Sequence, residues 1–317
     1  ARCSAPSTTK QHTQHDQPHN QPVRRNGGSS DVFRDVSCSS ATIDDFTKPQ
    51  NGALGQPNKP QFDALDKDVD VITVGIAGND IGYTGLALDC VRTTPTADLG
   101  GEPDCTPQNF DRGVDKVSRK IQATAPELAA AIQRMHQLSQ NAAVFIVSYP
   151  DALPDDAKAC WPYLPIRQSD MPYLVAKFKE MNAMLKTTAE RNDATYIDIY
   201  AGSIGHDACK PPALAWVNGV VLAPPSYPAH PNDLSYLNSA PVVAQQINVT
   251  LASRSKAAAA PATTTTTSPT TTTSPSRPPP VVRGKVLPRT GGSASVALAV
   301  TLGATLLIAL RRRIRSA

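Results

Sequence analysis

The segment Val69–Gly82 has the sequence VDVITVGIAGNDIG. Its first half is apolar and rich in β-branched residues, which is typical of a strand buried inside a sheet. Its second half is rich in glycine and contains Asn79-Asp80, a composition that favours a tight turn. We therefore predict a buried strand at Val69–Val74 that delivers the side chain of Asn79 to the end of that strand.

Working outward, two more segments are predicted as buried strands, namely Ala143–Val147 and Thr195–Ile199. Helical patterns lie between and after them, at residues 111–140 with a break near Ala125-Pro126, at 171–191 and at 234–251. Strands that alternate with helices predict a parallel sheet covered on both faces. Ligands bind such sheets at the carboxyl ends of the strands, so Asn79 is well placed for chemistry.

The charge of the chain gives no sign of a nucleic-acid partner. The formal net charge is +4, but four arginines lie within the last seven residues. Without those four, 27 basic side chains are balanced by 27 acidic ones. No basic patch remains that would attract a phosphate backbone.

Six cysteines occur, at positions 3, 38, 90, 105, 160 and 209. If the protein is exported, as the end of the chain described below implies, an even number predicts three disulfides, and their spacing does not resemble a zinc site. The spacing alone leaves all pairings open. His12, His15 and His19 lie in a polar stretch without supporting carboxylates, so we predict solvated side chains there and no metal site.

The end of the chain has three parts in a fixed order: LPRTG at Leu287–Gly291, an uncharged apolar run at Ser293–Leu310, and a basic tail. This order resembles the cell-wall sorting signal read by Gram-positive sortases. The resemblance implies cleavage between Thr290 and Gly291 and transfer of Thr290 to a peptidoglycan precursor. About 18 helical residues extend roughly 27 Å, enough for a transient membrane span with the arginines on the cytoplasmic side. A buried C-terminal helix and a permanent membrane anchor are the alternatives.

The composition divides the chain into four predicted parts. Residues 1–30 are disordered or aberrant, 31–253 form the folded domain, 254–286 are a Thr- and Pro-rich spacer, and 287–317 are the sorting signal. The spacer has too little apolar surface to fold, and its prolines favour extended geometry. It would hold the domain clear of a thick wall, so we expect a secreted, wall-anchored protein.

Three blocks of the domain fit one known pattern. They are Asp35–Thr42 (DVSCSSAT), Val74–Gly82 (VGIAGNDIG) and His230-Pro231-Asn232, and Trp216–Gly219 agrees with them. These blocks resemble the SGNH (GDSL) hydrolases, in particular the actinobacterial esterase and lipase branch. The resemblance extends over about Phe33–Ile247. It implies an α/β fold, a flavodoxin-like three-layer sandwich with a parallel sheet.

The same resemblance implies a role for each matching residue. His230 would be the general base that takes the proton of a serine nucleophile and returns it to the leaving alcohol. The side-chain amide of Asn79 and the backbone N–H of Ser40 would donate hydrogen bonds to the oxyanion. No cofactor is implied. The implied disulfides are Cys3–Cys38, Cys90–Cys105 and Cys160–Cys209.

The chain departs from the family pattern in three respects. It contains no Gly-Asp-Ser block, which follows the family's first strand and supplies the nucleophile. We therefore expect that strand and serine to be missing, whether by truncation, frameshift or true loss, with a signal peptide further upstream in the natural protein. Tyr227 stands where relatives often have the aspartate of the triad, and Asp233 is a poor substitute. Ser40 replaces a glycine, which strains the backbone if φ is positive there.

Two functional hypotheses follow. The first is a monomeric, wall-anchored hydrolase that cleaves carboxylic esters of small molecules or lipids through a serine acyl-enzyme. As printed, this chain would be inactive because the nucleophile is absent. The alternative is a non-catalytic binding or adhesion module displayed on the same fold. Neither hypothesis specifies the length of the acyl chain.

Overall fold

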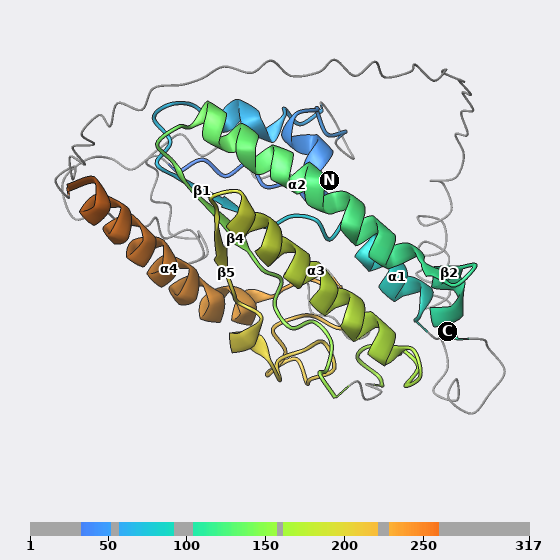
Figure 1. Ribbon diagram of the computed structural model, residues 1–317. Coiled ribbons are helices and arrows are strands. Elements are labelled where there is room, and N and C mark those ends of the chain that lie inside the picture. Colours follow the sequence, from blue (N-terminus) through green and yellow to red (C-terminus); the bar gives the residue numbers. More distant parts are fainter. Residues whose placement is uncertain (1–32, 52–56, 92–103, 157–160, 221–227, 260–317) are drawn as a thin grey trace, which may run out of the picture. The chain divides into compact units, whose positions relative to one another are not determined.

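Three parallel strands form the central sheet of the computed structural model (Figure 1). They are β1 (Val71–Val74), β4 (Ala143–Val147) and β5 (Thr195–Ile197), in the order β1-β4-β5. Val71 lies opposite Ala143, and Phe145 lies opposite Thr195. The structure describes residues 33–51, 57–91, 104–156, 161–220 and 228–259, all within one compact unit.

Helices follow or precede these strands. The α-helices are α1 (Tyr83–Asp89), α2 (Lys116–Leu138), α3 (Met171–Arg191) and α4 (Asp233–Ala259). A small antiparallel hairpin, β2 (Phe110–Asp111) and β3 (Val114–Asp115), lies before α2. Short 3-10 helices complete the described elements: η1 (Ile43–Phe46), η2 (Gln61–Ala64), η4 (Thr106–Asn109) and η5 (Ala201–Ser203).

The sheet is buried on both faces, which makes the fold a three-layer α/β sandwich. On one face, Ile72 and Ile146 pack against Leu128 of α2 and Leu185 of α3. On the other face, the neighbouring residues of the strands pack against α4, with Phe145, Ile197 and Ile247 at the centre. Successive side chains of a strand point to opposite faces, so an apolar run such as β4 supplies both cores. Figure 1 shows α2 and α3 on one side of the sheet and α4 on the other. The predicted fold class is therefore confirmed.

Several predicted boundaries were wrong. The helix at 111–140 begins only at Lys116, because Phe110–Asp115 form the hairpin, and it continues through Pro126 without the predicted break. Pro126 is exposed, and the buried side chains on the opposite side, such as Ile121 and Leu128, keep the helix packed. A proline removes one backbone hydrogen bond, and packing along 23 residues outweighs that loss here.

At the other end of the domain, α4 continues past Ser253 to Ala259, so the spacer does not begin at 254. The added residues are mostly Ser, Lys and Ala, and the lysine and alanine have high helix propensity. Residues 1–30, the remainder of the spacer, the LPRTG motif and the apolar run 293–310 lie outside the described residues. Within the described ranges, no helix combines the length and apolarity needed to cross a membrane.

Candidate active site

The turn after β1 is held by a tyrosine from the loop after β4. The backbone N–H of Gly78 donates to the Oη of Tyr149 at 3.0 Å. A Cβ on residue 78 would lie 2.8 Å from that oxygen, so only glycine permits this approach. Burial raises the pKa of the Tyr149 phenol, which therefore stays neutral and can accept this hydrogen bond at physiological pH. The turn thereby gains a fixed position relative to β4.

Asn79 and Asp80 join this turn to the segment that contains Ser40. The Nδ2 of Asn79 donates to the carbonyl of Ala41 at 2.9 Å, and the Oδ1 of Asp80 accepts from the N–H of Ile43 at 2.9 Å. Both bonds join residues far apart in sequence, so they act as a clamp between two loops. Since Nδ2 carries two hydrogens and Ala41 uses one, the other hydrogen can serve a second acceptor. Asn79 is exposed, as a group that meets substrate must be.

Holding the Asp80 carboxylate in this clamp costs free energy, because the group is partly removed from water. Burial raises the pKa of its carboxyl, and the hydrogen bond from Ile43 partly opposes that shift. Its second oxygen, Oδ2, is buried and has no hydrogen-bond partner. The hydrogen bond from the N–H of Ile43 to Oδ1 therefore holds this partly buried carboxylate in position.

Ser40 occupies the third position of a tight turn. The N–H of Ala41 donates to the carbonyl of Cys38 at 3.2 Å, and Ser40 has a φ of 63°. A positive φ at this position is the mark of a type II turn, which favours glycine. Ser40 therefore adopts the positive φ that the family's glycine would adopt more easily, at the cost of backbone strain.

His230 has its imidazole oriented by a backbone carbonyl. Its Nδ1 lies 2.8 Å from the carbonyl oxygen of Pro228. A carbonyl can only accept, so Nδ1 must carry the hydrogen and the lone pair of the neutral ring lies on Nε2. The carbonyl of Pro228 thus takes the orienting role that a carboxylate has in a Ser-His-Asp triad. A main-chain carbonyl is one way in which relatives orient this imidazole, but no motif could single out Pro228, because every residue carries a carbonyl.

A network of backbone bonds holds the loop of His230. The carbonyl of His230 accepts from the N–H of Asn218, and the N–H of Ala229 donates to the carbonyl of Asn218, each at 3.0 Å. Asn232 then begins α4, since its Oδ1 accepts from the N–H of Leu234 at 3.0 Å. The His-Pro-Asn block therefore combines an oriented imidazole with a helix N-cap.

Direct hydrogen bonds join two of the predicted site segments, whereas the third is related to them only through neighbouring residues that share one apolar cluster. The clamp above joins Ser40 to Asn79. Ile81, two residues after Asn79, and Val217, beside His230 in the backbone network, are buried in the same apolar cluster. The turn of Asn79 and the loop of His230 thus pack on one core.

Three of the five described non-glycine residues with positive φ lie at or beside these residues, and the other two, Arg112 and Asp193, lie elsewhere. Ser40, Ala77 and Ala229 have positive φ values of 63°, 94° and 58°. One is a site residue, one lies two residues before Asn79, and one directly precedes His230. Strained backbone of this kind persists where the surrounding structure enforces it, commonly at functional sites.

Disulfides cross-link the described part of the domain. Cys90 and Cys105 form a disulfide, the pairing that the resemblance implies. Cys38 and Cys209 are also disulfide-bonded, while their expected partners Cys3 and Cys160 lie outside the described residues. Among described side chains, the one cluster with metal-ligand spacing is Cys90, Cys105 and Asp170. Its sulfurs are joined to each other and its carboxylate accepts from the N–H of Cys105 at 3.0 Å, so this cluster is structural.

The sequence matches a family model over residues 7–237, and that model describes the GDSL-like Lipase/Acylhydrolase family. The chain belongs to this family. This GDSL-family chain is 32% identical over 202 residues to Lipase 2 of Streptomyces coelicolor, and the match covers 63% of this chain. It is 27% identical over 203 residues, 58% of the chain, to an esterase of Streptomyces scabiei. The matches span 66% and 59% of the lengths of these two relatives.

One solved structure has a similar fold. Phospholipase A1 from Streptomyces albidoflavus NA297 superposes with a TM-score of 0.50 at 18% identity. The match covers 65% of this GDSL-family chain and 76% of that enzyme. At this level of identity the likeness concerns the arrangement of strands and helices alone.

Proposed function

We propose that this GDSL-family domain hydrolyses carboxylic esters through a serine acyl-enzyme. The observation that carries the proposal is the orientation of His230, whose Nδ1 bond to Pro228 places the lone pair on Nε2. The clamp between Asn79 and Ala41 supports it, because it fixes an amide donor beside the strained turn of Ser40. The names of the relatives, a lipase and an esterase, agree with this chemistry.

The proposed reaction needs four groups. Nε2 of His230 takes the proton of a serine hydroxyl, whose oxygen attacks the ester carbonyl carbon. Asn79 Nδ2 and the N–H of Ser40 donate to the developing oxyanion, a contribution typically worth about 3–4 kcal/mol for one donor. His230 then protonates the leaving alcohol, and a water activated by the same imidazole releases the acid.

The serine must come from a Gly-Asp-Ser block, which the printed sequence does not contain. The test therefore compares this chain with a form extended upstream of Ala1 by the family's first strand and that block. We expect hydrolysis of p-nitrophenyl esters by the extended form and none by the chain as printed. Rapid hydrolysis by the printed chain, abolished by His230→Ala, would show that another residue is the nucleophile. An inert but folded extended form would count against the hydrolase.

A non-catalytic binding module is the second candidate. Its support is Tyr227, which stands where relatives often have the aspartate of the triad. The coding DNA upstream of Ala1 separates the two candidates. An in-frame strand with Gly-Asp-Ser supports the enzyme, and a signal peptide joined directly to Ala1 supports the binder.

We also propose that the domain is secreted as a monomer and anchored to the cell wall. The support is the order LPRTG, apolar run and basic tail at the end of the sequence. A sortase incubated with the chain and a nucleophile such as triglycine should release the residues after Thr290. Mass spectrometry would show the new C-terminus, and Thr290→Ala should block it. Cleavage elsewhere, or none, would remove the anchoring proposal.

A further inference from the structure

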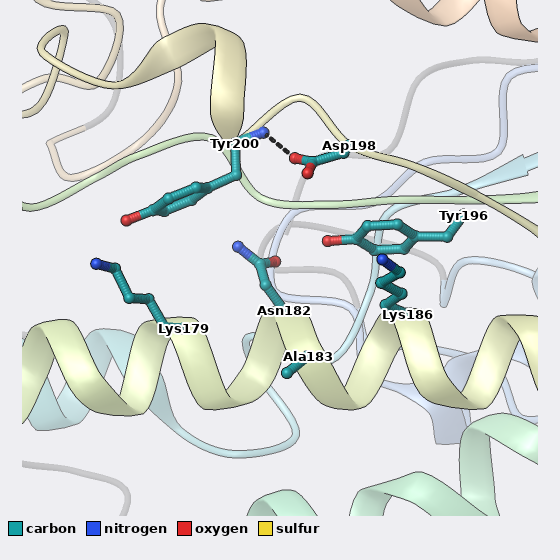
Figure 2. A pocket seen from close by; sticks show the side chains of 7 residues that line it. All are labelled: Lys179, Asn182, Ala183, Lys186, Tyr196, Asp198 and Tyr200. Carbon is teal, nitrogen blue, oxygen red and sulfur yellow. Dashed lines mark hydrogen bonds between the residues drawn. The ribbon is translucent and has the colours of Figure 1, made fainter.

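A groove lies between α3 and residues 196–200, a segment that starts in β5 and continues past its end (Figure 2). It has a volume of about 150 Å³. Its walls are one stripe of the helix and one face of the extended chain, lined by Lys179, Asn182, Ala183, Lys186, Tyr196, Asp198 and Tyr200. The helical residues recur at the spacing of one helix face, and the others alternate along the strand direction. The small side chain of Ala183 leaves the space between the two walls open (Figure 2).

One end of the groove is closed by internal bonds. The Nζ of Lys179 lies 2.8 Å from Asp155 Oδ1, and the Tyr200 hydroxyl donates to the same carboxylate at 2.7 Å. The side-chain amide of Asn182 bonds both the N–H and the carbonyl of Tyr149. These groups shape the groove, and their polar atoms are engaged by the protein itself.

The other end offers hydrogen-bond donors to a ligand. Lys186 is exposed, and within the described part of the chain no carboxylate lies within ion-pair distance of it. The Tyr196 hydroxyl points toward the middle of the groove, where it can donate its hydrogen to a ligand (Figure 2).

Two further properties define the chemistry of the ligand. Burial raises the pKa of Tyr196 to about 12, so this phenol is a neutral donor at physiological pH. Asp198 is exposed and uses Oδ1 for the N–H groups of Tyr200 and Ala201 at 2.9 and 3.2 Å. Its Oδ2 can accept from the hydroxyl groups of a ligand.

We propose that this groove binds a saccharide unit that bears an oxyanion, either a carboxylate or a phosphate. Lys186 and Tyr196 donate to the oxyanion, Asp198 accepts from ring hydroxyls, and the Tyr196 and Tyr200 rings provide apolar surface. The groove is open to solvent, and its space of about 150 Å³ is comparable to that of a cavity that holds one six-membered ring. The site is formed by α3 and the β5 chain alone, so it does not depend on ester hydrolysis.

The test uses the 317-residue chain, which needs no nucleophile for binding. Ligand-observed NMR titrations measure its affinity for glucuronic acid, glucose 6-phosphate and glucose. The variants are Lys186→Gln and Tyr196→Phe, with circular dichroism as the check on folding. Lys256→Gln is the matched control, because it removes an exposed lysine from α4 on the other face of the sheet.

We expect saturable binding of at least one of the two anionic sugars, and glucose at least about fivefold weaker. Lys186→Gln and Tyr196→Phe should each weaken that binding about fivefold, the size of one lost exposed polar contact. Lys256→Gln should bind like the parent. The proposal is overturned if neither anionic sugar binds, if glucose binds as well as they do, or if Lys186→Gln changes affinity no more than Lys256→Gln.

Discussion

Replacing Asp80 with alanine removes one half of the clamp between the Asn79 turn and the Ser40 segment. The lost interaction is the 2.9 Å bond from the N–H of Ile43 to Oδ1. A hydrogen bond to a charged group contributes about 1.5–3 kcal/mol. The alanine variant also removes the unfavourable burial of a carboxylate whose Oδ2 has no hydrogen-bond partner, and this gain offsets part of the lost free energy. We therefore expect a net loss of about 1–2 kcal/mol in the free energy of unfolding.

Asp80→Asn is the control, because it keeps an oxygen for Ile43 and removes the buried charge. We expect this variant to stay within about 0.5 kcal/mol of the parent. Urea unfolding at neutral pH, followed by circular dichroism with the disulfides oxidised, measures both. The alanine variant should shift the midpoint by about 0.5–1 M. An unchanged alanine variant, or an asparagine variant as unstable as alanine, would refute the clamp.

Three further predictions concern stability. Ser40→Gly should stabilise the chain by about 0.5–1 kcal/mol in urea unfolding, because φ at this position is 63°, and a loss would contradict the strain argument. Lys177→Met should cost about 3 kcal/mol, since it leaves Asp115 and Glu180 without the ammonium that lies 2.7 and 2.6 Å away, and a loss below about 1 kcal/mol would contradict this. Burial raises the pKa of Asp151 to about 6 from 3.8, so the folded state binds its proton more tightly than the unfolded chain. This group's contribution is greatest below about pH 4 and falls by up to about 3 kcal/mol as pH rises to about 6, and thermal melts of Asp151→Asn should lack this slope.

The sequence predicted the parallel sheet because its strands are short β-branched runs buried on both faces. The sequence motif identified Asn79 and Asp80 but not the contacts that they make, because the bond from Ile43 to Asp80 joins positions 37 residues apart. The carbonyl of Pro228 could not be predicted, because its role arises from the conformation of the loop. The predicted break at Pro126 failed because packing on α3 outweighs one missing backbone hydrogen bond.

The most direct test of the proposed mechanism is kcat/KM for p-nitrophenyl ester hydrolysis. It is measured for the form extended with the Gly-Asp-Ser block and for the His230→Ala and Asn79→Ala variants of that form. We predict that each substitution lowers kcat/KM by at least about 100-fold, while Lys256→Gln leaves it unchanged. If the extended form hydrolyses the ester and its His230→Ala variant does so at the same rate, His230 is not the base and the proposed mechanism is wrong.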